Sequence, residues 1–321
     1  MKHFLVVNPA AGKVNALPRI RAEYEHLKEK YDVTLYETKG HGDATEFVRR
    51  TVEENPGAEM RFYACGGDGT LKEVVNGAVG APRGVSVSCY PCGSGNDFVK
   101  YYGGAEHFLS LTALFEGEER DIDLLFDGRE YSVNVANFGF DYAVCHTMER
   151  VRRYPFLGGK KAYYAGIVKA LFTSLKNNVR VYADGELLTD KKEFLLCTVA
   201  NGTHIGGSYM CAPRSDNEDG MLELCYVKAV SLPKFLNLIG YYKRGEHLDN
   251  PKFDPYIIYR RVRRITVASE DRGFGYTLDG EMRECGSFTL EIAPAAVRFA
   301  IPASAKEALQ ARKSAAQAVT V

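Results

Sequence analysis

Short apolar runs rich in β-branched and aromatic residues alternate with amphipathic helical patterns along the first 125 residues. The runs predict strands at 4–7, 33–36, 61–64 and 85–90, and the patterns between them predict helices at 17–30, 44–54 and 71–78. Strands that each lead into a helix are typical of a parallel sheet covered by its connecting helices. Asp43 and Glu46 predict a capping box at the start of the second helix. We therefore expect residues 1–125 to form an α/β domain.

The pattern changes after residue 125, where strand-like stretches follow one another with few helices between them. The stretches at 131–136, 193–199, 221–227, 263–268 and 288–292 predict a mainly antiparallel β domain over residues 126–302. Helices are expected at 160–176 and at 231–242, where Ser231 is a candidate cap and Pro233 lies in the first turn. Residues 303–321 predict either a short helix that packs back on the first domain or a frayed tail.

The charge balance and the cysteines exclude several classes of protein. The 321 residues include 41 Lys plus Arg and 41 Asp plus Glu, so the formal net charge is zero and a generally basic nucleic-acid binder is excluded. No apolar run approaches the roughly 20 residues needed to cross a bilayer, and we expect an unexported protein. The eight cysteines show no paired framework, which favours a reducing cytoplasm. Cys89 and Cys92 form a C-x-x-C pair, but a zinc site would need a second pair.

Three glycine-containing turns follow predicted strands of the α/β domain. They lie at 8–12, 66–70 and 93–97, and the last two contain an acid, Asp68 and Asp97. Glycines let the backbone approach a ligand, and the start of the next helix offers N–H groups that suit phosphate. An acid beside phosphates repels them unless a divalent cation lies between, so the pattern indicates a metal–nucleotide ligand or general-base chemistry. Such turns emerge at the carboxyl edge of a parallel sheet, so we expect them to meet in one crevice.

Together these motifs resemble the catalytic domain of the diacylglycerol kinase family, and more closely the soluble bacterial lipid kinases of that family. In the first half the resemblance rests on Gly66–Thr70 with Glu73 and Asn76, on Gly93–Asp97, on Asn8, Pro9 and Gly12, and on Thr38 ahead of Gly42–Ala44. In the second half it rests on Ala200–Gly202 with Gly206 and Gly207, on Asp216 and Asp219–Leu222, and on Leu278–Glu281. The Gly-Gly-Asp-Gly-Thr motif alone is shared with NAD kinases, whereas the combination is specific.

The resemblance covers about residues 3–301 and implies a two-domain kinase that uses ATP and Mg²⁺. Its fold would be an N-terminal α/β nucleotide-binding domain of the NAD kinase and diacylglycerol kinase type, followed by a mainly antiparallel β-sandwich domain that binds the lipid. The active site would lie in the cleft between them. The ATP-binding residues that it implies are Asn8, Gly12, Thr38, Gly66, Gly67, Asp68, Gly69, Thr70, Gly93, Ser94, Gly95 and Asn96. Ser94 stands where the family more often has threonine, and it keeps the hydroxyl.

The resemblance also assigns acids to catalysis. Asp279 would be the general base that takes the proton of the lipid hydroxyl, with Glu281 and Asp68 as further catalytic residues. From the residues alone, the Asp279-Gly pair predicts an ordinary hairpin turn.

Two metal sites follow from the same resemblance. Asp68, Asp97 and Asp123 would organise the Mg²⁺ of ATP, although Asp121 lies two residues from Asp123 on the same strand face. Asp216, Asp219 and the carbonyl of Met221 would hold a structural Mg²⁺, where the sequence alone predicts another Asp-Gly turn.

A basic and aromatic stretch lies between residues 150 and 180. It holds eight Lys or Arg residues and no acid, interleaved with tyrosines and phenylalanines. We expect this stretch to dock on anionic membrane, with a solvated basic helix face as the alternative. The run 260–264 also contains four arginines, but it lies in strand-like sequence and is interpreted as a charged sheet face.

These observations favour an ATP- and Mg²⁺-dependent lipid kinase, with diacylglycerol as the first candidate acceptor and phosphatidic acid as the product. Two alternatives stay open: a kinase of a soluble acceptor, as in NAD kinase, and a non-catalytic nucleotide- or lipid-binding regulator. The expected partners are the lipid substrate and, transiently, an anionic membrane surface, without nucleic acid. The expected location is the cytoplasm with peripheral attachment to the membrane. The sequence leaves open the oligomeric state, a homodimer included, and the choice between diacylglycerol, a sphingoid base, a polyprenol and a glycolipid.

Overall fold

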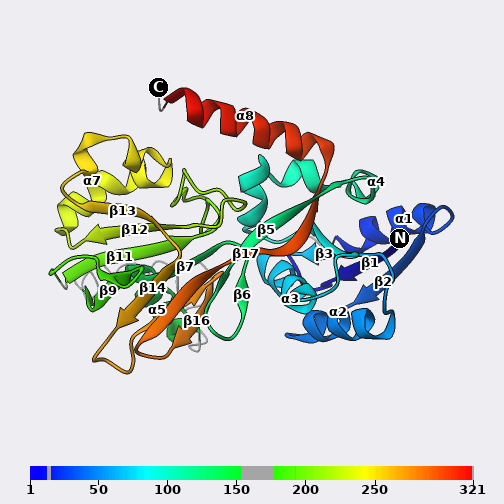
Figure 1. The fold of residues 1–321 in the computed structure, drawn as a ribbon, viewed down its shortest axis with the longest axis horizontal. Helices are drawn as coiled ribbons and strands as arrows, with labels where there is room; N and C mark the ends of the chain where they lie inside the picture. The colour runs from blue at the N-terminus through cyan, green and yellow to red at the C-terminus, as the bar shows by residue number, and fades with distance from the viewer. Residues whose placement is uncertain (13–15, 153–176, 192, 320–321) are drawn as a thin grey trace. The chain divides into compact units, whose positions relative to one another are not determined.

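The computed structural model describes residues 1–12, 16–152, 177–191 and 193–319, and it divides into two units (Figure 1). Unit 1 contains Met1–Leu124, Asn217–Asp219 and Ala293–Val321. Unit 2 contains Leu125–Asp216 and Gly220–Ile292. Each unit buries its own apolar side chains.

Unit 1 is built on a parallel sheet. Its strands lie in the order β2 (Asp32–Glu37), β1 (Lys2–Val7), β3 (Met60–Gly66) and β4 (Val85–Pro91), and the end of β17 (Phe288–Ile301) joins in parallel beside β4. Every residue of β3 and β4 is buried, as expected of parallel strands covered on both faces. The four strands lie where the apolar runs predicted them, and the predicted α/β fold is confirmed.

Helices follow three of these strands. They are α1 (Leu17–Leu27) after β1, α2 (Asp43–Glu54) after β2 and α3 (Asp68–Ala78) after β3. The chain after β4 forms the short helices η1 (Phe98–Tyr102), η2 (Ala105–Phe108) and α4 (Leu111–Phe115), and then β5 (Glu118–Phe126). The C-terminal segment forms α8 (Ala303–Val319), which packs on η1 and η2 and buries Ala305 and Leu309.

The capping box expected at the start of α2 is wrong. The N-cap is Gly42, with φ of +82°, and the carboxylate of Glu73 on α3 accepts from the backbone nitrogens of Gly42 (2.9 Å) and Ala44 (3.3 Å). The carboxylate of Asp43 instead accepts a hydrogen bond from the hydroxyl of Tyr36 (2.9 Å). An acid from a neighbouring helix therefore takes the place that the local sequence assigned to Asp43.

Unit 2 is a β-sandwich, as predicted. Among the described residues one sheet has the order β13 (Ile257–Val262), β12 (Leu222–Lys228), β11 (Glu193–Ala200), β7 (Val135–Gly139), β15 (Gly275–Leu278) and β16 (Glu281–Glu284), with β8 (Asn177–Asn178) beside β11. The other contains β10 (Glu186–Leu187), β9 (Arg180–Ala183), β14 (Arg264–Ala268) and the start of β17. All these pairs are antiparallel, and side chains from both sheets share one core, which includes Phe138 and Val267. The short β6 (Tyr131–Ser132) pairs with the end of β5.

Helices α5 (Phe140–Arg152) and α7 (Leu232–Lys243) cover the outer face of the first sheet. They enclose a second apolar cluster that includes Val144, Leu195 and Phe235, and η3 (Glu246–Leu248) and η4 (Pro251–Phe253) follow α7. The sequence predicted α7, and Ser231 precedes it as expected, although its side chain makes no capping hydrogen bond. It did not predict α5, and the helix expected at 160–176 lies outside the described residues.

Most of the basic stretch at 150–180 also lies outside the described residues, so the membrane docking expected there stays a prediction. Arg260, Arg261 and Arg264 lie on β13 and β14, and each pairs with a carboxylate of unit 2. None of the described helices combines the length and the apolar character needed to span a bilayer.

The stability of the protein is expected to fall in acid, because two histidines are buried in the neutral form. Burial lowers the pKa of His3 and of His247 from 6.5 to about 4, so between these values the unfolded chain binds more protons than the folded chain. This contribution to the free energy of unfolding is complete above pH 6.5, and it decreases toward pH 4 by up to about 3 kcal/mol per histidine. Urea unfolding at neutral pH and near pH 4 measures the loss. A His247→Phe variant should lose clearly less stability on acidification, and equal loss would contradict the assignment.

Candidate active site

The turns after β1, β3 and β4 meet at one edge of the unit 1 sheet. The backbone nitrogen of Asn8 donates to the carbonyl of Cys65 (2.9 Å), and that of Cys92 donates to the carbonyl of Gly66 (2.8 Å). The side-chain amide of Asn8 also donates to the hydroxyl of Thr70 (3.1 Å) on α3. The structure therefore brings together the three turns that the sequence placed at the carboxyl edge.

The turns after β3 and β4 touch through their backbones at Gly67 and Gly93, and Gly66 lies close to the side chain of Thr70 in its own turn. A Cβ atom on Gly93 would lie 2.5 Å from the Cα of Gly67, and one on Gly66 would lie 2.2 Å from the hydroxyl oxygen of Thr70. Only glycine allows such a close approach. Gly69 differs, because a Cβ atom there would meet nothing within 4 Å, so the backbone is open to a ligand on that side.

Two carboxylates converge beside Gly95. A Cβ atom on Gly95 would lie 3.1 Å from Oδ2 of Asp68 and 3.6 Å from Oδ2 of Asp97, so both oxygens border the space that a side chain would fill. Burial raises the pKa of Asp68, and the charge of Asp97 raises it further. The ammonium of Lys100, which the sequence did not single out, lies 2.5 Å from Oδ1 of Asp97. The two carboxylates give the site a negative charge, which the ammonium of Lys100 partly neutralises.

This donor set fits Mg²⁺. In kinases Mg²⁺ is held by one or two carboxylates, while water and phosphate oxygens complete its shell. No three His, Cys, Asp or Glu side chains of the described residues group into a metal site. Asn96, with φ of +48°, donates its amide to the carbonyl of Gly93 (3.0 Å), and its buried Oδ1 has no partner. An unpaired buried acceptor in this turn is a further sign of a ligand site.

The other residues expected at the nucleotide lie in the segments that follow β1, β2 and β4. Thr38 comes directly after β2, and its backbone nitrogen donates to the carbonyl of Val7 (2.8 Å). Gly12 after β1 has φ of +76°, and both Gly12 and Ser94 are exposed. A small pocket beside these turns is lined in part by Gly66, Gly67, Asp68, Leu71, Asn96 and Phe98.

Asp123 lies on β5 and is buried. Its backbone nitrogen donates to the carbonyl of Asn217 (2.7 Å), and its Oδ1 accepts from the backbone nitrogen of Ala295 (2.8 Å). Asp121 is more exposed and pairs with Arg83 (3.5 Å). These hydrogen bonds give Asp123 a structural role within unit 1. Its role at the metal stays a prediction.

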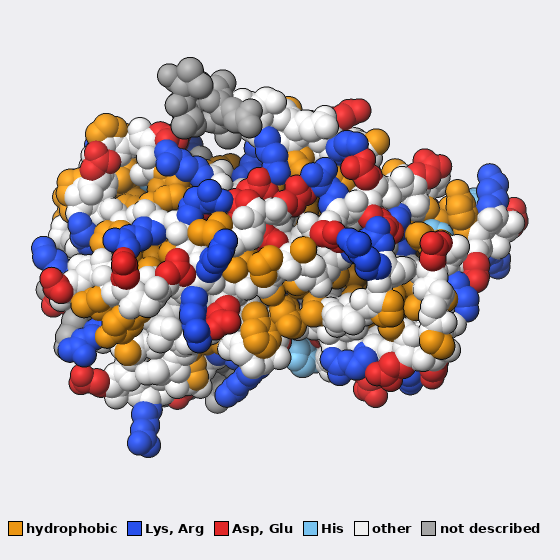
Figure 2. Space-filling view, in the orientation of Figure 1, with side chains coloured by type: hydrophobic (Ala, Val, Ile, Leu, Met, Phe, Trp, Pro, Cys, Tyr) orange, Lys and Arg blue, Asp and Glu red, His pale blue; other side chains and the backbone are white. Residues whose placement is uncertain are grey.

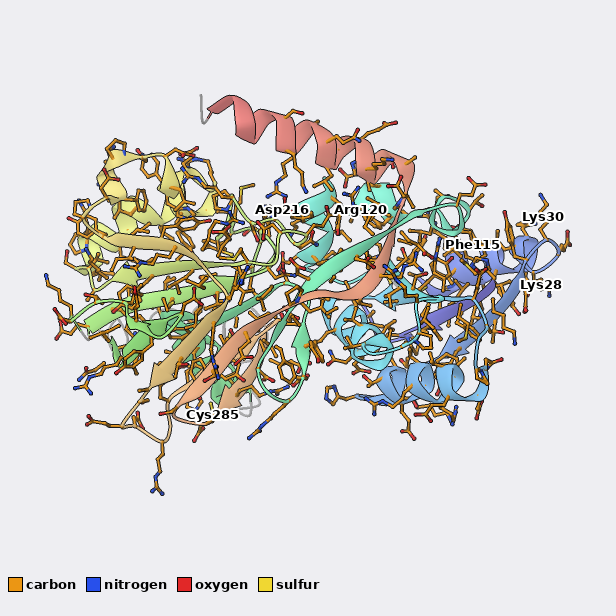
Figure 3. The ribbon with its side chains drawn as sticks, in the orientation of Figure 1. Lys28, Lys30, Phe115, Arg120, Asp216 and Cys285 are labelled. Carbon is orange, nitrogen blue, oxygen red and sulfur yellow. The ribbon has the colours of Figure 1, made fainter. Side chains whose placement is uncertain are left out.

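The segment from Asp216 to Met221 is held to β5 by an ion pair that the sequence did not predict. The carboxylate of Glu218 pairs with the guanidinium of Arg120 on β5 (2.5 Å), and Figure 3 labels this arginine. Asp216 is half-buried, and Asp219 is exposed. The structural Mg²⁺ site of Asp216, Asp219 and the Met221 carbonyl stays a prediction.

Asp279 in unit 2 combines the expected turn with a fixed carboxylate. Asp279 and Gly280 form the two-residue turn between β15 and β16, with φ of +49° and +86°, as in a type I′ hairpin. The Asp279 carboxylate accepts from Ser132 Oγ (2.7 Å) and from the backbone nitrogens of Val135 (3.0 Å) and Val133 (3.2 Å). Three donors, from the end of β6 to the first residue of β7, therefore fix its orientation.

The sequence did not predict which residues surround Asp279. Ser132 precedes it by 147 positions and reaches it because β7 pairs with β15. Glu281, two residues after Asp279, pairs with Arg283 (3.2 Å), which also pairs with Glu130. The catalytic role of Glu281 stays a prediction.

Comparisons with known proteins agree for both halves of the chain. The model of the diacylglycerol kinase catalytic domain matches residues 2–126, and that of the YegS C-terminal NAD kinase beta sandwich-like domain matches residues 134–301. A diacylglycerol kinase of Bacillus subtilis (strain 168) is 27% identical over 288 residues, which cover 86% of this chain and 88% of that protein. One of Staphylococcus aureus (strain Newman) is 28% identical over 273 residues, which cover 83% of this chain and 81% of that protein.

Two solved structures from Bacillus anthracis str. Sterne have the same fold. One aligns with a TM-score of 0.74 at 21% identity and covers 94% of this chain and 97% of its own. The other, described as a diacylglycerol kinase, aligns with a TM-score of 0.70 at 18% identity and covers 95% and 98%. The chain therefore belongs to the diacylglycerol kinase family of lipid kinases, with a catalytic domain and a YegS-type β-sandwich domain.

Proposed function

We propose that the protein is an ATP- and Mg²⁺-dependent kinase that phosphorylates the hydroxyl of diacylglycerol and forms phosphatidic acid, a step of phospholipid biosynthesis. The observation that carries the proposal is the contact between the 66–70 and 93–97 turns, with two carboxylates beside one space, in a member of a lipid kinase family. Phosphoryl transfer depends mainly on positioning and charge neutralisation, which such a site can supply. The diacylglycerol kinases among its relatives support the choice of acceptor.

Backbone groups are the proposed ligands of the ATP phosphates. Helix α3 begins at Asp68 with Gly67 as its N-cap, so its first N–H groups have no partner within the helix. Gly69, in the first turn, has open space where a Cβ atom would lie. The positive end of the helix dipole favours an anion at the same place. The turns at 8–12 and 93–96 and the side chain of Thr38 would complete the phosphate site.

Asp68 and Asp97 are the proposed carboxylates for Mg²⁺, with Asp123 as a third. When bound, the cation neutralises charge on the transferred phosphate. Burial raises the pKa of Asp68 and the charge of Asp97 raises it further, and a cation would relieve the repulsion between the two carboxylates. Asp216, Asp219 and the Met221 carbonyl are proposed to hold a second, structural Mg²⁺.

Asp279 is the proposed general base. The lipid hydroxyl oxygen bonds to the γ-phosphorus, its proton passes to the Asp279 carboxylate, and the bond from the γ-phosphorus to the bridging oxygen breaks so that ADP leaves. The hydrogen bonds from Ser132, Val133 and Val135 keep the carboxylate in place for this transfer. Asp68 is a second candidate for proton transfer, as the resemblance to the family implies.

Analysis of the lipid products by mass spectrometry tests the proposed reaction. Incubation with ATP, Mg²⁺ and dispersed diacylglycerol should yield phosphatidic acid, and omission of ATP or addition of EDTA should abolish it. Phosphorylation of NAD instead would favour a soluble acceptor. ATP binding without any phosphorylated product would favour a regulator.

Replacing Lys100 is expected to strengthen metal binding at the acid pair. In Lys100→Met, Mn²⁺ used as a probe for Mg²⁺ should bind about tenfold more tightly without nucleotide. The ammonium of Lys100 lies 2.5 Å from Asp97 and competes with the metal for that carboxylate. Titration followed by the electron paramagnetic resonance of Mn²⁺ measures the affinity.

Two variants control for other effects of the substitution. Lys28→Met removes the cation of another i,i+3 pair, formed with Glu25 at the end of α1, and should leave Mn²⁺ binding unchanged (Figure 3). Lys100→Arg keeps the charge and should bind Mn²⁺ like the wild type. Equal or weaker Mn²⁺ binding by Lys100→Met would argue against metal binding at Asp97.

A further inference from the structure

Helix α7 is apolar on the side that packs inward. Phe235, Leu238 and Tyr242 are buried, and Phe235 and Tyr242 belong to the cluster that also holds Leu195 on β11 and Val227 on β12. A surface helix with such an inner face normally carries charged side chains on its opposite face.

The outward face of α7 carries few charges. Leu236 is 60% exposed, the largest exposed fraction of any large hydrophobic side chain among the described residues. Pro233 and Asn237 are exposed as well, and the charged residues of the helix are Lys234 and the exposed Lys243. An exposed leucine on a face without acidic side chains is suited to an apolar partner.

Cations surround this face, and each lies over an aromatic ring. The four pairs are Lys234 over Tyr256 (4.7 Å to the ring centre), Arg244 and Lys252 over Tyr241 (5.1 Å each), and Lys243 over Tyr209 (5.8 Å). Figure 2 shows orange apolar side chains together with blue basic and red acidic ones over the region where Figure 1 places α7. Basic and aromatic side chains around an exposed leucine are typical of surfaces that enter the headgroup region of a bilayer.

The charge of this surface identifies the kind of bilayer. Arg244 pairs with Glu246 (2.7 Å), so its charge is largely offset. Lys234, Lys243 and Lys252 carry the remaining attraction, which favours anionic lipid.

An apolar cavity of about 30 Å³ lies beneath α7. It is lined by apolar and aromatic side chains, Leu196, Ile239 and Phe253 among them. The cationic side chains described above lie at the outer surface of the helix, so the membrane contact is assigned to that surface.

We propose that the α7 surface, formed by Leu236, Tyr241, Lys234, Lys243, Arg244 and Lys252, docks unit 2 on an anionic membrane. Leu236 enters the acyl boundary while the lysines contact lipid phosphates and carboxylates. The proposal rests on the proposed function in one respect, that the acceptor lipid is taken from a bilayer. This surface is separate from the stretch at 150–180, where the sequence predicted membrane contact.

Vesicle binding by two leucine variants tests the proposal. Leu236→Glu should weaken binding to phosphatidylcholine vesicles that contain phosphatidylserine by at least about tenfold, because it removes the inserted side chain and adds a repelled charge. Leu187→Glu is the matched control, since Leu187 is 40% exposed on β10 of the same unit and should leave binding unchanged. The double variant Lys243→Glu with Lys252→Glu should lose the preference for phosphatidylserine. Co-sedimentation measures all three, and equal melting temperatures show that the fold is kept.

Activity in two substrate forms separates this surface from the chemistry. Leu236→Glu should phosphorylate diacylglycerol in vesicles more slowly than the wild type, but short-chain diacylglycerol dissolved in water at the same rate. Wild-type vesicle binding by Leu236→Glu would overturn the proposal. So would a change of oligomeric state with vesicle binding unchanged, because a second copy would then be the partner of this face. A wild type that binds vesicles but phosphorylates neither form would instead contradict the proposed function.

Discussion

Asp279→Asn should reduce lipid phosphorylation by about 10² to 10⁴-fold while ATP still binds. An amide cannot accept the proton of the attacking hydroxyl, whereas the nucleotide turns lie in unit 1 and are not altered by the substitution. Asparagine tolerates the φ of +49° at this position, so the turn is kept. Its NH₂ group would replace one of the two oxygens and meet either the backbone nitrogen of Val133 or the donors Ser132 and Val135, which should cost about 1–3 kcal/mol of stability.

The chain contains a matched control for this substitution. Asp184 and Gly185 form the same kind of turn between β9 and β10, with φ of +49° and +89°. Oδ1 of Asp184 accepts from the backbone nitrogens of Arg263 (2.9 Å) and Arg264 (2.8 Å). Asp184→Asn should therefore lower the melting temperature to a similar degree and leave the rate of phosphorylation unchanged. Equal rates in the two variants would remove Asp279 as the base.

Gly93→Ala should weaken ATP binding by at least about tenfold and destabilise unit 1 by about 1–3 kcal/mol. The added Cβ would lie 2.5 Å from the Cα of Gly67 and 2.9 Å from Oδ1 of Asn96, so the turn after β4 must move away from the turn after β3. Separating the turns would also separate Asp68 from Asp97. Isothermal titration with ATP and denaturant unfolding measure the two effects.

Gly69→Ala distinguishes the packing of the turns from their contact with the nucleotide. A Cβ atom at Gly69 meets no atom within 4 Å and lies within α3, so this variant should fold as well as the wild type or gain up to about 1 kcal/mol. Its ATP affinity should still decrease if the phosphates lie against this side of the helix. Full stability together with full ATP affinity in Gly93→Ala would contradict the proposed contact between the two turns.

The strands of unit 1 could be predicted because their apolar character is local. Within β3 and β4, however, Arg61 and Ser88 are buried as well. Arg61 pairs with Glu119 (2.9 Å), and Ser88 donates to the carbonyl of Ala300 (2.8 Å), which lies 212 positions away. A sequence pattern cannot show such partners, because a buried polar group is tolerated only when the folded chain supplies them.

The candidate site was predictable to a similar extent. The glycines and acids at 66–70 and 93–97 lie in short segments with a physical reason for each residue type, and the structure brings these segments together. The cap of α2 by Glu73, the pairing of Lys100 with Asp97 and the donors to Asp279 depend on elements that meet only after folding. Helix α5 was missed because it begins directly after β7, so no turn or loop sequence separates the two elements.

The most direct test of the proposed function is the transfer of labelled γ-phosphate from ATP to a panel of acceptors in the presence of Mg²⁺. The panel contains diacylglycerol, a sphingoid base, a polyprenol, a glycolipid and NAD. We predict that the label enters diacylglycerol in preference to the other lipids and does not enter NAD. Label in NAD alone, or in no acceptor despite measurable ATP binding, would contradict the assignment as a diacylglycerol kinase.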